Sequence, residues 1–343
     1  MGAVGWARFG TLTATRVSAI THDPADLTSG FWAVVLTFEG ELTALRFEEV
    51  RQGAAPTTRA WKRLTGNWRS SLDRTAYLTG VAQIRERVGA GTVYQVNLCR
   101  VLTHDLAEDA DVPGLAALLQ GEHPAPYEAT IHAPEAGLDI VCASPEGYLE
   151  RHDSLLTSRP IKGTATHLSR MLPKDYAENV MIVDLVRNDI ARVCRPGTVR
   201  VDRLCAPESH PGLVHLVSDV GGELRPGVGW SDILAATFPP GSVSGAPKVT
   251  ALKAIQDLEP VPRGPYCGAL GWIDADRGTA RLAVGIRSFW ADREGDGRRV
   301  LRFGTGAGIT WGSDPTAEWE ETDLKAAALI SLAGGRHSAR VDP

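Results

Sequence analysis

Four carboxylates occupy positions that could hold a hard metal ion. Asp175 and Glu178 stand three residues apart near the start of a helix expected over residues 175–193, and Glu318 and Glu321 repeat this spacing in a second expected helix. Residues three apart project from the same face of a helix, so the two pairs could converge on one ion. Mg²⁺ prefers a few carboxylates together with water and anionic substrate groups. The other interpretation is solvated helix surface, because the helix dipole favours acidic residues in first turns.

Lysine is scarce in this chain, so each lysine is a candidate for special chemistry. Only six of the 36 basic residues are lysines, and a bias toward arginine codons accounts for the scarcity. Unlike an arginine, a buried lysine can lose its proton and act as a nucleophile. The six lysines are residues 62, 162, 174, 248, 253 and 325.

Hydrophobic periodicity predicts the elements that must position these side chains. Apolar residues at helical spacing predict helices over residues 74–88, 175–193, 230–236, 248–258 and 316–332. Aromatic and β-branched runs predict strands at residues 31–38, 42–47, 93–102, 127–132, 138–143, 148–156, 213–220, 266–273, 280–290 and 300–303. Strands broken by long single helices favour an α+β fold in which helices cover antiparallel sheets.

The composition excludes several functional classes. The 343 residues carry 36 basic and 41 acidic side chains, for a net charge of −5, whereas a nucleic-acid-binding surface is basic. No apolar run approaches the ~18 residues that cross a bilayer, and the N-terminus lacks the apolar core of a signal peptide. Five cysteines without CxxC spacing indicate reduced thiols in a cytoplasmic protein. We therefore expect neither nucleic acid nor membrane as a partner.

Two glycine-rich segments fail the tests for nucleotide binding. Residues 241–248 (GSVSGAPK) lack the Walker A spacing, and residues 304–308 (GTGAG) lack the third glycine of the dinucleotide fingerprint. The sequence also contains no G-x-S-x-G elbow of a hydrolase and no G-x-C-x-G turn that would carry a glutaminase nucleophile.

Eight segments form a specific set by their order and spacing. They are YQVNLCR (94–100), SPEGYL (144–149), RPIKGT (159–164), AENVMIVDLVRNDIARVC (177–194), HLVSDVGGEL (215–224), FPPGSVSGAPK (238–248), RGPYCGALGWID (263–274) and GTGAGITWGSDPTAEWEET (304–322). Together they resemble the chorismate-utilising enzymes, which include anthranilate synthase component I, aminodeoxychorismate synthase component I, isochorismate synthase and salicylate synthase. The resemblance implies two packed antiparallel β-sheets flanked by helices. Residues 75–335 would form the catalytic domain, and residues 1–70 a short strand-rich segment that packs on it.

The resemblance also assigns the site residues. Glu178 and Glu321 match the ligands of Mg²⁺, with Asp175 and Glu318 as their neighbours. The positions that match chorismate-binding residues are Gly163, Thr164, Ser242, Tyr266, Arg287, Gly306, Ala307 and Gly308. An arginine fork and a metal ion suit a substrate with two carboxylates, and glycine lets backbone amides approach a ligand closely.

Two positions discriminate between members of this family. Lys162, in RPIKGT, resembles the lysine nucleophile of aminodeoxychorismate synthase, where anthranilate synthases carry alanine. Its alternative roles are a surface lysine and a lysine that binds a substrate carboxylate. Gln95 stands where isochorismate and salicylate synthases carry a lysine that activates water. Both positions favour an aminase that is most similar to aminodeoxychorismate synthase component I.

The resemblance implies amination of chorismate at C4. Lys162 attacks C2, Glu146 protonates the hydroxyl that leaves C4, and ammonia adds at C4 and displaces Lys162. The product is 4-amino-4-deoxychorismate, on the para-aminobenzoate and folate pathway. His215 matches a histidine that lines the pocket, or is a packed histidine at a strand start.

The source of ammonia implied by the resemblance is a separate glutamine amidotransferase subunit. Two alternatives to this function stay open at the level of the sequence. The chain could be an anthranilate synthase component I, or it could be a non-catalytic chorismate-binding protein.

Overall fold

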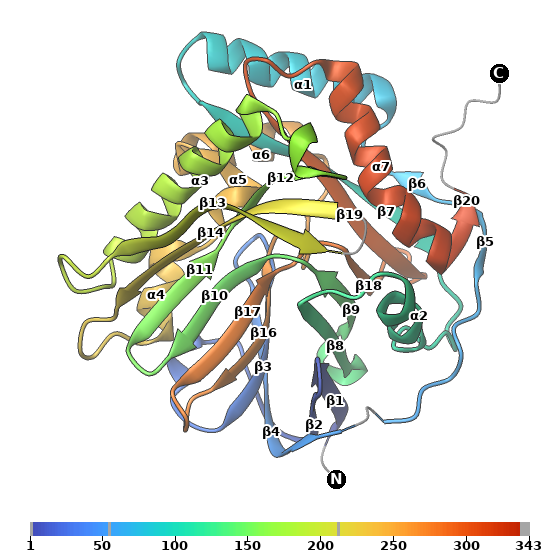
Figure 1. Cartoon of the computed structure of the whole chain (residues 1–343). Coiled ribbons are helices and arrows are strands. Elements are labelled where there is room, and N and C mark those ends of the chain that lie inside the picture. The colour runs from blue at the N-terminus through green and yellow to red at the C-terminus, as the bar shows by residue number, and fades with distance from the viewer. Residues whose placement is uncertain (1–2, 54–55, 211–212, 337–343) are drawn as a thin grey trace.

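The computed structural model describes residues 3–53, 56–210 and 213–336. Within them, eighteen strands are joined in one hydrogen-bonded network in which every pairing is antiparallel, and helices flank it (Figure 1). The predicted class of antiparallel sheet with covering helices is confirmed. The two expected sheets appear as two halves of this network, because the N-terminal hairpin hydrogen-bonds to both of them.

One half of the network is built around the central hairpin β10–β11 and the strands beside it. In spatial order it contains β13 (Arg200–His210), β14 (Leu213–Glu223), β11 (Leu155–Arg159), β10 (Gly147–His152), β17 (Thr279–Val284), β16 (Ala269–Asp274), β3 (Phe31–Leu36) and β4 (Leu42–Gln52). The short strand β12 (Ile161–Ala165) also pairs with β14. Most side chains of the largest hydrophobic cluster come from this half and from the helix that covers it.

The other half contains β8 (Tyr127–Ala133), β9 (Leu138–Ser144), β18 (Ser288–Arg293), β19 (Arg299–Ile309) and β7 (Gln95–Asp105), in that spatial order. The short strands β6 (Arg69–Ser70) and β15 (Gly245–Ala246) pair with β7. The hairpin of β1 (Ala3–Phe9) and β2 (Leu12–Thr21) connects the halves, because β2 pairs with β4 and β1 pairs with β8. A separate parallel pair joins β5 (Leu64–Asn67) to β20 (Gly334–Arg336).

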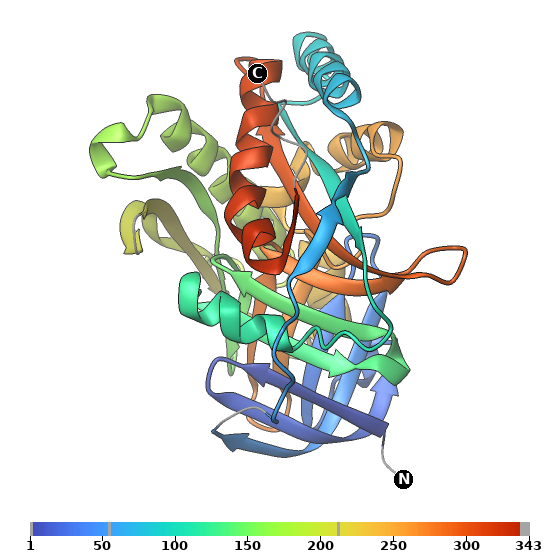
Figure 2. The same ribbon diagram turned by 90° about the vertical axis from the view of Figure 1, so that its right-hand side faces the viewer.

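The helices are α1 (Arg74–Gly89), α2 (Gly114–Glu122), α3 (Pro173–Ala191), α4 (Trp230–Thr237), α5 (Gly241–Ser244), α6 (Lys248–Leu258) and α7 (Pro315–Ala333). Three 3₁₀ turns cover Pro24–Asp26, Pro134–Ala136 and Leu168–Arg170. Side chains of Asp73 and Asp314 cap α1 and α7 by accepting hydrogen bonds from backbone amides of the first turn. In Figure 1, α3 and α7 flank β12 and β19, and Figure 2 shows both helices in the same upper part of the molecule.

Three predicted strands needed correction. The single strand expected at 148–156 is the hairpin β10–β11, whose turn contains Asp153 with a left-handed φ of 53°. The single strand expected at 280–290 is divided into β17 and β18, and the strand expected at 266–273 begins only at residue 269. Residues 150–154 (ERHDS) are all polar and Gly285 follows β17, so the sequence did mark both breaks, and the prediction overlooked them. The sequence analysis also missed β1, β2, β12, β13 and α2.

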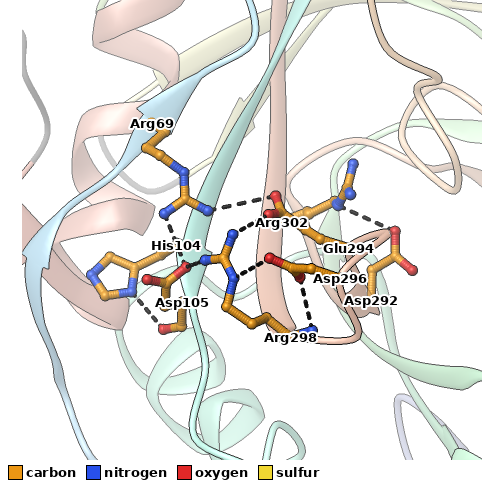
Figure 3. A network of polar contacts seen from close by, with 8 residues as sticks. All are labelled: Arg69, His104, Asp105, Asp292, Glu294, Asp296, Arg298 and Arg302. Carbon is orange, nitrogen blue, oxygen red and sulfur yellow. Dashed lines mark hydrogen bonds and ion pairs between the residues drawn. The ribbon is translucent and has the colours of Figure 1, made fainter.

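A network of exposed charges fixes the hairpin β18–β19 against β6 and β7 (Figure 3). The Asp105 carboxylate receives Arg69 at 2.9 Å and Arg298 at 3.0 Å, and Glu294 pairs with the same two arginines at 3.5 and 2.9 Å. The hydrogen bond from Arg69 lowers the pKa of Asp105. Exposed pairs contribute less than about 1 kcal/mol each, so this network selects the hairpin position more than it stabilises the fold.

Among the helices that are described, none is long and apolar enough to cross a bilayer.

Candidate active site

Lys162 lies on β12, and its amine faces Gly308 of β19. A methyl group built on Gly308 would lie 3.3 Å from Lys162 Nζ and would overlap the side-chain amide of Gln95. Gln95 is the first residue of β7, which pairs with β19. Because Gly308 has no side chain, the amine and the amide both fit over the backbone of β19. The structure thus brings together the two positions that discriminate between family members.

Gln95 contributes an open hydrogen-bond acceptor. Its side chain is 1% exposed, and Oε1 accepts no hydrogen bond from any residue that the structure describes. A buried polar atom without a partner costs about 1–3 kcal/mol. A donor that enters the site, such as an amine, would remove that cost.

Asn179 of α3 fixes the backbone of β12 at Lys162. Its buried amide donates hydrogen bonds to the carbonyl oxygens of Lys162 at 3.3 Å and Leu216 at 2.9 Å, and it accepts one from Ser218 Oγ at 2.5 Å. These bonds join α3, β12 and β14 at the level of the lysine. The sequence analysis missed Asn179, although a polar residue on the buried face of the predicted helix was a signal for it.

The neighbours of Lys162 on β12 also match their predicted places. Gly163 has a φ of +84°, and a Cβ there would meet Asp175 Cβ at 2.9 Å, so a side chain would push α3 away from β12. Thr164 pairs with His215 across the ladder between β12 and β14; the Thr164 side chain lies outside the described part of the structure. His215 is 3% exposed.

Glu146 stands between β9 and β10 with its carboxyl group buried. Burial raises the pKa of Glu146 to about 7, against the opposing effects of the Ser242 hydroxyl, the charge of Lys162 and the backbone amide of Ile161. Ser242 lies on α5, and its hydroxyl acts to lower the pKa of this carboxyl group. A carboxyl group with such a pKa carries a proton near neutral pH and can act as a general acid.

Three further carboxylates converge from two helices. Burial raises the pKa of Glu178 on α3 and of Glu318 on α7, and in both cases the charge of Glu321 adds to the increase. Burial also acts to raise the pKa of Glu321, but its ion pair with Lys325 outweighs this effect and lowers it. The charge of Glu321 on α7 thus acts on Glu178 of α3, and a shared metal site of these two helices stays a prediction.

Lysines balance this acidic group. Lys325 Nζ lies 2.6 Å from Glu321 Oε1 and donates a hydrogen bond of 3.1 Å to the carbonyl oxygen of Gly306. The charges of Lys162 and Lys174 both act to lower the pKa of Glu178 and Glu321. Three of the six lysines of an arginine-rich chain thus lie around the carboxylates. The sequence analysis counted these lysines without assigning Lys174 and Lys325 to the site.

The carboxylate oxygens of this site are suitable ligands for a hard metal ion, but they do not form a complete coordination sphere. In the described part of the chain, no three His, Cys, Asp or Glu side chains are already arranged as metal ligands. Asp175 is occupied elsewhere, because its Oδ2 accepts a hydrogen bond of 2.7 Å from the Leu172 amide and so caps α3. Two carboxylates on facing helices fit Mg²⁺, which takes its other ligands from water and substrate oxygens.

Arg287 is partly buried, and its guanidinium has no carboxylate partner among the described residues. Desolvation alone lowers its pKa, and its φ of 52° is left-handed. Strained residues of this kind cluster at ligand clamps, which agrees with the predicted role in binding an anion. Tyr266 packs its ring on the backbone of Gly304, and burial raises the pKa of its hydroxyl.

Residues 306–308 alternate along β19. Gly306 and Gly308 lie on one face of the strand, and Ala307 lies on the other. The Ala307 side chain is fully buried in a hydrophobic cluster with Leu98 and Ile309. Of the three predicted positions, the two glycines therefore face the site, and Ala307 can reach a ligand only through its backbone.

Comparison with protein families gives one match. The model for chorismate binding enzymes matches residues 39–331. The chain belongs to this family.

Two curated relatives of this chorismate binding enzyme carry different names at similar identity. Anthranilate synthase component 1 of Streptomyces coelicolor is 37% identical over 279 residues, which cover 78% of this chain and 53% of the relative. Aminodeoxychorismate synthase component 1 of Bacillus subtilis is 34% identical over 288 residues, which cover 80% and 59%. The chain thus spans between half and two thirds of the length of these relatives.

Solved structures agree with the fold. The menaquinone-specific isochorismate synthase from Escherichia coli superposes with a TM-score of 0.80 at 18% identity, and the match covers 96% of this chain and 88% of that one. At this identity the likeness concerns the fold alone.

Proposed function

We propose that this chorismate binding enzyme aminates chorismate at C4 to give 4-amino-4-deoxychorismate. The observation that carries the proposal is the position of Lys162, whose amine lies over Gly308 and within the electrostatic reach of Glu146, Glu178 and Glu321. An amine so placed can attack a ring held between the carboxylates and β19. The relative from Bacillus subtilis, named for this amination, supports the same choice.

Each step has a residue to perform it. Lys162 attacks C2 as the neutral amine, the ring double bonds shift, and the C4 hydroxyl leaves as water with the proton of Glu146. Ammonia then forms a bond to C4, and Lys162 departs from C2 as a neutral amine. The unpaired guanidinium of Arg287 and the backbone of Gly306 and Gly308 would hold the substrate during these steps.

Glu178 and Glu321 would hold Mg²⁺, which would neutralise the ring carboxylate of chorismate and so favour nucleophilic attack on the ring. Lys325 pairs with Glu321 at 2.6 Å, so that this carboxylate is already charged and oriented. Glu318 and Asp175 then act as neighbours that hold helix ends and ligand geometry: Asp175 caps α3, and Glu318 bonds to Ser313.

The ammonia would come from a second subunit. The curated relatives are named as component 1 of their synthases, and this sequence has no G-x-C-x-G glutaminase turn. A separate glutamine amidotransferase in the cytoplasm is the partner that we propose. The product would enter the para-aminobenzoate and folate pathway.

Anthranilate synthesis is the second candidate, because a relative with that name is 37% identical. The two reactions differ in their products: amination at C4 retains the enolpyruvyl group, whereas anthranilate formation loses it as pyruvate. Chorismate, Mg²⁺ and ammonium are supplied to the purified protein, and the products are identified by mass spectrometry. Anthranilate as the direct product would overturn the proposed function, and an absence of any product would favour a non-catalytic chorismate-binding protein.

A further inference from the structure

A small cavity adjoins Glu146 on the side of α3. Its walls come from α3, from β10 and from the segment around α5, and its lining residues are all buried. Val186 and Ile190 of α3 provide apolar wall, and Glu146 and Ser242 also line the cavity. The interior has room for a molecule of the size of water or ammonia, and it is far too small for a chorismate ring.

The polar side chains of Asp189, Thr237 and Tyr148, which also line the cavity, already have partners. Lys248 Nζ lies 2.6 Å from Asp189 Oδ2 and donates a hydrogen bond of 3.0 Å to the carbonyl oxygen of Thr237. The hydroxyl groups of Thr237 and Tyr148 share a hydrogen bond of 2.6 Å. Glu146 and Ser242 are the polar lining residues that also belong to the candidate active site.

We infer that this cavity is the chamber from which ammonia reaches C4 of the substrate. The inference rests on the proposed function, in which Glu146 protonates the hydroxyl that leaves C4. Ammonia that enters C4 on the face from which the hydroxyl leaves approaches from the side where Glu146 stands. Apolar walls admit neutral ammonia more readily than ammonium, because a buried charge without a partner is costly.

The proton balance closes at Glu146. After Glu146 has given its proton to the departing hydroxyl, it is a carboxylate at the end of the cavity. The lone pair of ammonia forms the C4–N bond, the double bonds shift back, and the electron pair of the C2–N bond returns to Lys162. The new C4 ammonium group then gives one proton to Glu146, which restores the protonated acid and leaves the neutral amino product.

Two substitutions of Val186 test the chamber in opposite directions. Val186→Phe should fill the cavity and raise the KM for ammonium roughly tenfold, with the KM for chorismate and the rate of Lys162 adduct formation without ammonia unchanged. Val249→Phe is the matched control, because Val249 is 81% exposed on α6. Val186→Ala should enlarge the cavity and raise the preference for methylamine over ammonia, by about tenfold for one added methyl group.

The gain with methylamine cannot result from misfolding, so it keeps the inference testable if Val186→Phe folds poorly. An unchanged ammonium KM in folded Val186→Phe, or an unchanged amine preference in Val186→Ala, would overturn the chamber while 4-amino-4-deoxychorismate is still formed. Anthranilate from the unmodified protein would instead overturn the proposed function, so the two failures are distinguishable.

Discussion

Lys162 and Gly308 face each other at a distance that leaves no room for a side chain on the glycine. A methyl group at residue 308 would stand 3.3 Å from the Lys162 amine and inside the contact radius of the Gln95 amide. The Lys162 amine and the Gln95 amide therefore both pack on the backbone of β19. They can do so because Gly308 has no Cβ atom.

Gly308→Ala should keep the fold and lose most of the activity. The added methyl group displaces Lys162 and Gln95, and a displacement of about 1 Å can cost roughly 10²-fold in rate. Gly312→Ala is the control, because a Cβ at Gly312 would meet no atom within 4 Å. Steady-state kinetics and thermal unfolding of both variants check this prediction. Equal activity in the two variants would contradict it.

Lys162→Ala should abolish the covalent adduct and slow 4-amino-4-deoxychorismate formation. Residual turnover by direct attack of ammonia at the unblocked C2 should give an anthranilate-type product. Lys162→Arg is the matched variant, because it keeps the positive charge but cannot act as a neutral nucleophile. Intact-protein mass spectrometry after incubation with chorismate detects the adduct in the unmodified chain and its loss in both variants. If Lys162→Ala kept both rate and product, the lysine would have no covalent role.

Glu178→Gln and Glu321→Gln should each abolish activity without unfolding the protein. Each change removes a charged oxygen ligand from the proposed Mg²⁺ site, and Mg²⁺ binds neutral amides much more weakly than carboxylates. Glu320→Gln is the control, since Glu320 is an exposed neighbour on α7. Activity and Mg²⁺ titrations are measured for all three variants and for the unmodified protein in chelator. Full activity of the unmodified protein in chelator would rule out the metal.

The unfolding free energy of the Glu146→Gln variant, relative to that of the unmodified protein, should increase as the pH rises from 5 to 8. Burial raises the pKa of Glu146 from 4.5 to about 7 in the folded state, so the folded state binds more protons in that range and loses stability as they dissociate. The difference amounts to about 3 kcal/mol, at about 1.4 kcal/mol for each pKa unit. Urea unfolding of both proteins at several pH values measures it. A difference in unfolding free energy that stays constant with pH would show that Glu146 titrates normally.

The purified chain should use ammonium at alkaline pH, where more of it is neutral ammonia, and should not use glutamine. The reason is that the sequence lacks the glutaminase turn. Product formation is measured with each nitrogen source at equal chorismate. Rapid turnover with glutamine by the single chain would reveal a nucleophile that the sequence analysis overlooked.

Helices with strong periodicity were predictable, because their signal is local. Helix α6 has the bounds expected from its sequence, and α3 and α7 begin and end within a few residues of the expected positions. The strands β1 and β2 were not predicted, since residues 3–21 alternate weakly and gain their order from pairing with β8 and β4. The partner of β1 on β8 lies more than a hundred residues away and so leaves no local signal.

Site residues were predictable where the chemistry requires a particular residue type. They were not predictable where their role depends on how two elements pack together. Lys162 and Glu146 were assigned from the family resemblance, and the helix carboxylates from their spacing. The capping bond of Asp175 and the clamp of Asn179 on the Lys162 carbonyl depend on how α3 docks against β12. The packing of α3 against β12 depends on the tertiary structure. A sequence pattern therefore cannot give the roles of Asp175 and Asn179.

The strand β3 is synthesised long before β16, the strand with which it pairs. Trp32 hydrogen-bonds in register with Ile273, and these residues are 241 positions apart. At about 5–20 residues per second, the first strand waits roughly 12–48 s for its partner to be made. During that time the apolar run of β3 is an unpaired edge that invites aggregation. Yield in a host should therefore depend on chaperone supply and synthesis rate far more than the stability of the finished molecule suggests.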